Sequence, residues 1–328
     1  MSEFVIHPDW KETGGWLEAA STDDRTDELF GHVIEDVTVE SADRNEIVLV
    51  GEPFDRAVIG RSGASDGPTE IRKALARTKT AHFEHGRVRS IGDLGDVDSL
   101  VTFLEQDIGH VEPVEMVHNR LQGTTAAVHD LDALPVFLGG DNSLTFPNVA
   151  PLLDRGSVGV INLDAHLDVR DVREDATSGT PYRQLFEAGL DGYACLGARH
   201  FETSHAYREY VHRQGGTVIT ADELGENPVG AAAMALESLR DVEYVYVSVD
   251  CDVLDASAAP GVSAPTPGGI TTRELYRILG RLARDERIAG FEIVECAPPL
   301  DRDGMTVDAA ARAVAHFLAG YQGQEVSR

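Results

Sequence analysis

The chain has 328 residues, of which 42% are hydrophobic, and its 56 acidic and 28 basic residues give a formal net charge of −28. This hydrophobic content is ample for a large α/β core, and no run of about 18 apolar residues predicts a membrane span. Because the acidic excess leaves no basic footprint for nucleic acid, we expect neither nucleic acid nor a membrane as a partner.

Lysine is scarce among the cationic residues, since only Lys11, Lys73 and Lys79 accompany 25 arginines. An acidic, lysine-poor composition indicates a protein of a high-salt cytoplasm, where screening weakens the repulsion between like charges. The first residues carry neither a basic region nor an apolar signal core, so a cytoplasmic location is expected. Three cysteines without a C-x-x-C spacing fit a reducing compartment, and we expect Cys251 to be a packed thiol.

Residues 1–45 are polar, acidic and weakly periodic, and we predict a surface extension there, followed by a single catalytic domain over 46–328. Beyond residue 46, short apolar runs alternate with helical patterns, which predicts a parallel sheet covered by helices on both faces. The expected strands are 47–50, 135–138, 158–163, 193–196, 217–219, 244–249 and 288–294. The expected helices include 68–77, 97–121, 228–240, 272–284 and 306–318, with Thr271 and Glu274 as an N-terminal cap of the fourth.

Metal-capable side chains follow two of these strands. Asp164, His166 and Asp168 alternate at the end of one apolar run, and Asp250 and Asp252 follow another. Alternate residues of an extended strand point the same way, and ligands of parallel sheets bind beyond the carboxyl ends of the strands. The sequence therefore predicts that the five side chains converge on one site.

Four carboxylates and one imidazole suit a pair of Mn²⁺ ions better than a structural zinc site. Two such ions, about 3.5–4 Å apart, can share a water, lower its pKa toward neutrality and generate a hydroxide nucleophile. The opposing interpretation is that these are ordinary strand-end carboxylates of an acidic protein. The D-x-H-x-D pattern after one apolar strand and S-x-D-x-D after another favour the metal site.

The ordered motifs resemble those of the ureohydrolase (arginase and agmatinase) family. They are G-G-D at 139–141, D-A-H-L-D at 164–168, S-V-D-C-D-V-L-D at 248–255 and A-P-G-V-S-A-P-T-P-G-G at 259–269, with G-R-S-G-A upstream at 60–64. The resemblance implies a three-layer α/β/α fold with an eight-stranded, mostly parallel sheet, two Mn²⁺ ions and a homo-oligomer. It also implies a small-molecule substrate, with hydrolysis of a C–N bond in a guanidine or amidine by a metal-bound hydroxide.

The resemblance assigns roles to individual residues. Asp164 and Asp250 are implied to bridge the two ions, with His166 and Asp252 binding one ion and Asp168 the other. Asp168 is also implied to carry a proton to the leaving amine. Glu295 is implied to pair with the cationic head of the substrate, which suits a planar amidinium.

Two positions depart from the usual family pattern. Asn142 stands where the family usually has a histidine ligand, so its carbonyl oxygen is expected to bind the first metal only weakly or to hold a water. Ser178 stands where agmatinases have a histidine. The S-G-T-P stretch at 178–181, together with A-P-G-V-S-A-P, is similar to the formimidoylglutamases of this family, which hydrolyse N-formimidoyl-L-glutamate to formamide and L-glutamate in histidine degradation.

A formimino carbon is less crowded and less resonance-stabilised than a guanidinium carbon, so its hydrolysis can proceed without the helper histidine. We expect Ser178 and Thr180 to hydrogen-bond to the substrate. Arginines can bind its two carboxylates, and the arginines considered are Arg170, Arg173, Arg183 and Arg199, of which the last two are the chosen candidates. The alternatives are an agmatinase or other guanidino hydrolase, and an inactive relative that acts as a binding subunit.

Overall fold

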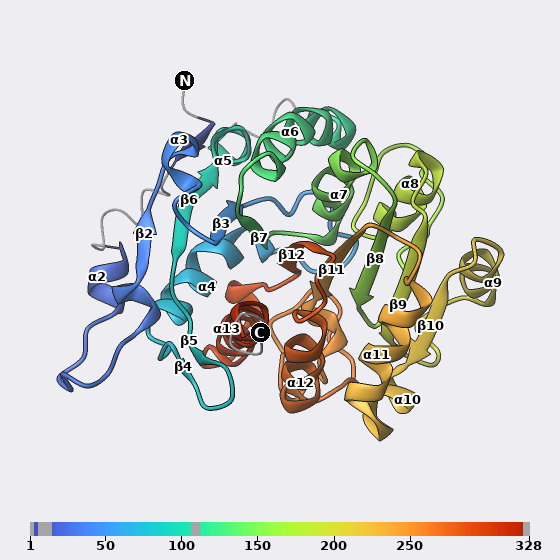
Figure 1. Ribbon diagram of the computed structural model, residues 1–328. Helices are drawn as coiled ribbons and strands as arrows, with labels where there is room; N and C mark the ends of the chain where they lie inside the picture. The colour runs from blue at the N-terminus through green and yellow to red at the C-terminus, as the bar shows by residue number, and fades with distance from the viewer. Residues whose placement is uncertain (1–2, 6–14, 106–111, 324–328) are drawn as a thin grey trace.

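The chain folds into three layers, with one sheet between two layers of helices (Figure 1). The computed structural model describes residues 3–5, 15–105 and 112–323. Within them, the main sheet has ten strands and a separate hairpin has two. The strands of the main sheet are β1 (Phe4–Val5), β2 (Ile34–Asp36), β3 (Ile47–Glu52), β6 (Ile91–Val97), β7 (Leu134–Gly139), β8 (Val158–Leu163), β9 (Gly192–Ala198), β10 (Thr217–Thr220), β11 (Tyr244–Asp250) and β12 (Ile288–Val294). The hairpin pairs β4 (Ala81–His82) with β5 (Gly86–Arg87).

Eight parallel strands form the centre of the sheet, in the order β6-β3-β7-β12-β11-β8-β9-β10. This confirms the predicted α/β fold and its parallel sheet. After β7 the chain passes over two positions to β8, and β11 and β12 later fill the gap. The carboxyl ends of these four strands therefore meet at a change in strand order, which is where open α/β sheets bind ligands.

The predicted count of eight strands is too small, because β1 and β2 add to the same edge strand. β1 pairs antiparallel and β2 parallel with β6. Both come from residues before 46 and are only two and three residues long, too short to show a period in the sequence. The side chains of Trp16 and Phe30 are buried as well. The division into an extension over 1–45 and a domain over 46–328 stays a prediction.

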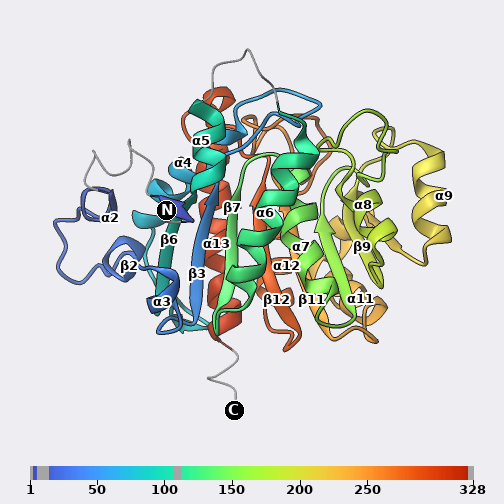
Figure 2. The same cartoon turned by 90° about the horizontal axis from the view of Figure 1, so that it is seen from above.

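Helices cover both faces of the sheet. Figure 2 shows α5 (Asp98–Glu105), α6 (Val114–His129) and α7 (Thr145–Leu153) on the face opposite α12 (Thr272–Leu282) and α13 (Met305–Gln322). α8 (Pro181–Ala188) joins the first layer, beside α7. The other helices are α2 (Gly15–Ala19), α3 (Val39–Ala42), α4 (Gly67–Ala76), α9 (His205–Arg213), α10 (Ala221–Glu226) and α11 (Pro228–Ser238). None of the described helices is long and apolar enough to cross a membrane.

The helix predicted over 97–121 is wrong, because β6 ends at Val97 and two helices follow it. Proline lacks the N–H that a helix interior needs, and Pro113 is the N-cap of α6. The strand β6 itself was missed, because its Asp93 and Asp96 suggest a polar loop. Both are buried, and Arg72 pairs with them at 2.8 and 2.5 Å. Paired charges can be buried where single ones cannot.

The predicted cap of α12 is confirmed. The Thr271 hydroxyl accepts a hydrogen bond from the Glu274 backbone N–H, and the Glu274 carboxylate accepts one from the Thr271 N–H. This capping box satisfies two donors at the start of the helix. It fixes where α12 begins, directly after the 259–269 segment.

Candidate metal and hydrolytic site

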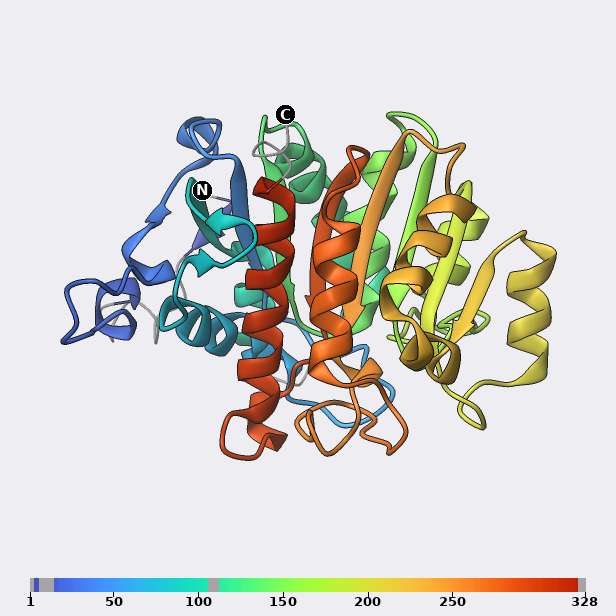
Figure 3. The ribbon, with the colours of Figure 1, turned by 60° about the horizontal axis from the view of Figure 1, so that its bottom comes forward.

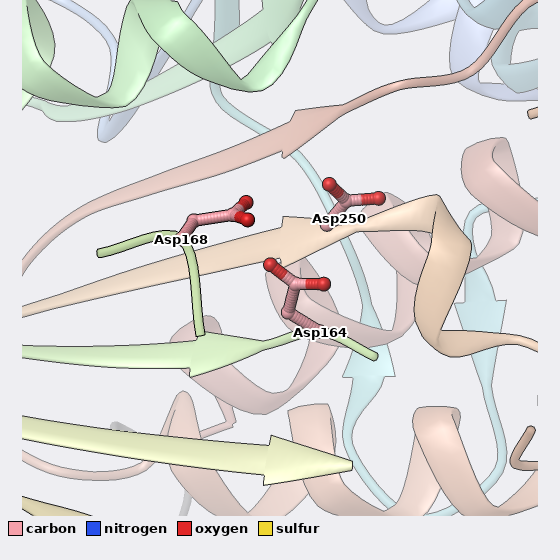
Figure 4. Close-up of side chains that lie close together, drawn as sticks. All are labelled: Asp164, Asp168 and Asp250. Carbon is pink, nitrogen blue, oxygen red and sulfur yellow. The ribbon is translucent and has the colours of Figure 1, made fainter. Parts of the chain in front are cut away.

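Three carboxylates gather at the carboxyl ends of β8 and β11. Ligand oxygens of Asp164, Asp168 and Asp250 all lie within 4.8 Å of one another (Figure 4). Asp164 follows β8 directly and Asp250 ends β11, so the parallel pairing of the two strands brings them together. Such a group of oxygen ligands could hold a hard divalent cation.

Backbone geometry places Asp168 beside Asp164. Its φ of 44° lies in the left-handed region, which non-glycine residues rarely adopt and which costs on the order of 1 kcal/mol or more. Glu295, after β12, also has a left-handed φ, of 62°. Strained residues of this kind cluster at active sites. Two of the predicted functional carboxylates therefore carry backbone strain that the surrounding fold must stabilise.

His166 and Asp252 lie at the edge of the carboxylate cluster. The His166 Nδ1 atom is 3.4 Å from Asp164 Oδ1, and its Nε2 atom is 3.4 Å from Glu202. Asp252 accepts hydrogen bonds from the Ser263 hydroxyl and the Ala264 N–H. The D-x-D stretch thus ties the 259–269 segment to the site, while its middle residue, Cys251, is a buried free thiol as predicted.

Burial and like charge perturb the cluster strongly. Burial, followed by the charge of Asp164, holds the pKa of Asp168 well above its ordinary value. Burial and the neighbouring carboxylates do the same for the pKa of Asp250, and burial raises the pKa of Asp252 to about 6. Burial alone would lower the pKa of the His166 imidazole. The hydrogen bond and negative charge of Asp164 outweigh this effect and raise the pKa to about 10. A bound cation would relieve this repulsion.

Asn142 turns its amide N–H, rather than its carbonyl oxygen, toward the cluster. Its Nδ2 donates to Asp168 Oδ2 at 2.6 Å, while its Oδ1 accepts from the Thr145 hydroxyl at 2.8 Å. Gly140, directly after β7, lets the chain pass close to Phe54. A Cβ at Gly140 would lie 1.7 Å from the Phe54 carbonyl oxygen. In this orientation Asn142 positions Asp168, and its predicted contact with a metal stays a prediction.

A buried polar layer beneath Asn142 was missed by the sequence analysis. The Thr145 hydroxyl also lies 2.5 Å from Glu292 Oε1. Glu292 Oε2 accepts from Asn148 and Tyr246 at 3.0 and 2.9 Å. Burial raises the pKa of Glu292. The only signal in the sequence is a glutamate inside the otherwise apolar run 288–294.

Glu295 is 1% exposed and is held by one of its oxygens. Its Oε1 accepts the Asn142 backbone N–H at 2.9 Å, and its Oε2 accepts no hydrogen bond of ordinary geometry from the described residues. Burial, followed by the charges of Asp141 and Asp252, holds its pKa well above the ordinary value. An unsatisfied buried carboxylate oxygen is costly, so this atom is suited to a cationic or hydrogen-bonding ligand.

The four predicted substrate-binding residues follow β8 and β9: Ser178 and Thr180 precede α8, Arg183 lies within α8, and Arg199 directly follows β9. The Ser178 hydroxyl accepts the Ile59 N–H at 3.1 Å, and Thr180 Oγ1 bonds to Thr177 and Gln184. Arg183 pairs with Asp171 and Glu187 and lies over the Tyr210 ring. These contacts stabilise the loop and leave the predicted role of Arg183 in substrate binding without support from its surroundings.

Arg199 is buried and holds the backbone of the second metal-capable segment. Its guanidinium donates to the carbonyl oxygens of Asp252 and Thr266, and its Nε lies 3.6 Å from Glu202. Arg199 therefore fixes the loop that carries Asp252. Glu202, which the sequence analysis did not single out, links Arg199 to His166.

Comparison with known proteins gives a consistent result. The Arginase family matches residues 45–320. The formimidoylglutamase of Halobacterium salinarum is 53% identical over 319 residues, which cover 96% of this chain and 98% of that protein. A crystal structure of formimidoylglutamase from Bacillus subtilis has a TM-score of 0.81 and 33% identity, covering 92% of this chain and 94% of that one. A Trypanosoma cruzi formiminoglutamase with Mn²⁺ shares the fold, with a TM-score of 0.77, 24% identity, and coverage of 94% and 98%.

Proposed function

Because this chain belongs to the arginase family, we propose that it is a hydrolase that cleaves N-formimidoyl-L-glutamate to L-glutamate and formamide. The observation that carries the proposal is the 53% identity to the Halobacterium salinarum formimidoylglutamase over almost the full length of both chains. The same relative supports the expected adaptation to high salt, which the net charge of −28 indicates.

The carboxylate cluster fits a pair of divalent cations, and Mn²⁺ is the proposed ion. The cluster offers oxygen ligands, and no lysine or arginine of the described chain pairs with them. Asp164, His166, Asp168, Asp250 and Asp252 would hold the ions. When bound, such a pair supplies a Lewis acid and lowers the pKa of a shared water to near neutrality.

Glu295 is the proposed partner of the cationic formimino group of the substrate. Its buried Oε2 has no hydrogen bond of ordinary geometry from the described residues, with Ser263 nearby. A formimino group is planar and cationic when protonated, so a charge-assisted hydrogen bond to this oxygen would orient the substrate. Glu295 would thereby fix which face of the formimino carbon is presented to the nucleophile. Alignment of this kind accelerates a reaction by removing orientational freedom before the chemical step.

Asp168 is the proposed proton carrier to the departing glutamate nitrogen. A positioned carboxyl group can transfer a proton when it lies within hydrogen-bond reach of the reacting atom, and burial favours the protonated form of Asp168. The amide of Asn142 anchors one carboxylate oxygen at 2.6 Å, so the carboxylate keeps one orientation as it exchanges the proton. Asn142 would thus support catalysis through Asp168.

Arg170 is the proposed partner of a substrate carboxylate. It follows Asp168 by two residues, is exposed, and its side chain packs beside Gly179 of the S-G-T-P stretch. The described chain provides no ion pair for it, whereas Arg183 and Arg199 are already engaged. An arginine in this position can bind a carboxylate through two parallel hydrogen bonds.

One assay tests the proposed function. The purified protein, in high KCl with added Mn²⁺, is incubated with N-formimidoyl-L-glutamate, and L-glutamate is measured enzymatically. Agmatine and arginine are tested in parallel for urea. Release of glutamate without urea supports the proposal, whereas urea from agmatine or arginine without glutamate would refute it.

A further inference from the structure

A cationic hollow lies away from the carboxylate cluster, between α12, α13 and the β4–β5 hairpin. Its volume is about 1060 Å³. Figure 3 shows α12 and α13 side by side on the outside of the sheet, with the hairpin beside α13. Seven lysine or arginine side chains line the hollow, but only one acidic residue does. In a chain with twice as many acids as bases, this is a strong local reversal of charge.

Four of the arginines form one stripe along α12 and the turn after it. They are Arg273, Arg277, Arg281 and Arg284, which line the hollow at spacings of four, four and three residues. Residues so spaced share one face of a helix. The opposite face carries Leu275, Ile278, Leu279 and Leu282, all buried in the core. The stripe thus lies on the outward side of an amphipathic helix.

The stripe has few carboxylate neighbours among the described residues: Asp285 lies close enough to Arg281 for the arginine to lower its pKa. No ion pair joins Arg273, Arg277 or Arg281 to an acidic side chain of the described residues. Arg284 contacts the His85 ring instead, at 2.9 Å. Like charges four residues apart on a helix destabilise it, and the charge of Asp285 reaches only the Arg281 end of the stripe. The excess of positive charge along α12 makes this face suited to an anion from outside the chain.

The other walls of the hollow add further cations. Arg77, Lys79 and Arg312 line it, and only Lys79 has an acidic partner, Asp27, at 2.7 Å. The single acidic residue of the wall is Glu84, which is exposed on the hairpin turn. Cations therefore approach the hollow from three separate elements, which is an arrangement suited to a ligand with several negative charges.

Aromatic rings form the floor between these cations. Tyr276 stacks on His316 with centroids 4.6 Å apart, His82 meets His316 edge to face at 5.4 Å, and His82 stacks on His85 at 4.5 Å. Burial, followed by His82 and Arg312, lowers the pKa of His316 to about 4. His316 is therefore neutral near pH 7, and the positive charge of the hollow comes from its arginines and Lys79.

We propose that the hollow between α12, α13 and the β4–β5 hairpin is a binding site for a small multivalent anion bearing phosphate or carboxylate groups. Guanidinium groups bind both kinds of group through paired hydrogen bonds. The volume of this open hollow is close to the upper end of the range for small-molecule sites. This site is separate from the carboxylate cluster and does not depend on the proposed hydrolytic function.

Titration of the full-length protein with inorganic tripolyphosphate tests the site, with citrate as the carboxylate probe. Binding is measured by calorimetry at two KCl concentrations, because screening should weaken it as salt rises. The test variant is the double substitution Arg277→Gln and Arg281→Gln. The matched control is Arg240→Gln with Arg302→Gln, two exposed arginines outside the hollow.

The expected result is that one of the probes binds and that the α12 variant weakens its binding about tenfold or more, as for the loss of charge-assisted hydrogen bonds. The control variant should bind as the unchanged protein does. Circular dichroism and turnover of N-formimidoyl-L-glutamate should be unchanged in both, since neither pair belongs to the catalytic site. Absence of binding, or equal binding by both variants, would overturn the proposal. So would a loss of oligomeric mass in the α12 variant without anion binding, because the face would then be a contact between subunits.

Discussion

A substitution of Thr145 tests whether its buried hydroxyl holds the side chains of Asn142 and Asp168 in place. This hydroxyl lies 2.8 Å from Asn142 Oδ1 and 2.5 Å from Glu292 Oε1, in a fully buried position. A hydroxyl has only one hydrogen to donate. Because burial raises the pKa of Glu292, its protonated carboxyl can donate to Thr145, which then donates to Asn142. Asn142 in turn donates to Asp168, so the chain of hydrogen bonds has a single direction.

Thr145→Val removes the hydroxyl while keeping the shape of the side chain. It leaves the Asn142 carbonyl oxygen and one Glu292 oxygen buried without their partner, at a cost of about 1–3 kcal/mol for each group. We therefore expect about 2–6 kcal/mol of destabilisation. If the released amide also loses its bond to Asp168, a charge-assisted hydrogen bond worth about 1.5–3 kcal/mol, kcat should fall by about tenfold to a hundredfold. KM should change little, because Thr145 lies beneath the site.

The assay is release of L-glutamate from N-formimidoyl-L-glutamate under saturating Mn²⁺, combined with a thermal unfolding curve for each variant. Thr145→Ser is the matched control, since it keeps the hydroxyl and loses only a methyl group. It should retain a kcat close to that of the unchanged protein. A Thr145→Val variant that folds and turns over at the full rate would show that the hydroxyl does not orient Asn142 and Asp168.

Three further outcomes follow from the site. Asp168→Asn should lower kcat by about 10²–10⁴-fold, as for loss of a proton-transferring group, with an unchanged circular dichroism spectrum; a near-normal rate would remove Asp168 from this role. Arg170→Gln should raise KM by about tenfold or more through loss of a charge-assisted contact, while Arg183→Gln should leave KM unchanged, and the opposite pattern would exchange their roles. The rise in melting temperature caused by Mn²⁺ should grow between about pH 5.5 and 7.5. Burial raises the pKa of Asp252 to about 6 and that of Asp250 well above its usual range, so protons compete with the ion at the lower pH; a shift that does not change with pH would contradict this.

Most of the central architecture could be predicted because buried parallel strands are nearly continuous apolar runs. β8 and β12 were predicted with their observed bounds, 158–163 and 288–294. The carboxylates after β8 and at the end of β11 could be placed together because parallel strands end at one edge of the sheet. β6 was not predicted because its charged residues Asp93 and Asp96 are neutralised by Arg72, which lies 21 and 24 positions upstream of them, and no local pattern reveals this pairing.

The role of each site residue depends on the direction of its side chain and on its partners, and no local sequence pattern predicts either of these. Asn142 was expected to offer its carbonyl oxygen to a metal, but Thr145 holds that oxygen away from the cluster. Arg183 and Arg199 were chosen as carboxylate binders because of their position in loops, yet both have partners within the chain. An arginine is informative about a ligand only when its other partners are known, and in an acidic chain these are numerous.

The arginines around the hollow between α12, α13 and the β4–β5 hairpin make the surface charge uneven, and the net charge alone does not show this. A quarter of the protein's 28 lysines and arginines line that hollow, so the remaining surface is more acidic than the average suggests. A particle of this kind has a large dipole moment and turns its positive face toward any anionic surface it approaches. Because the net charge of −28 governs the repulsion at long range, the positive face attracts an anion only within about a Debye length, and this attraction weakens as salt rises.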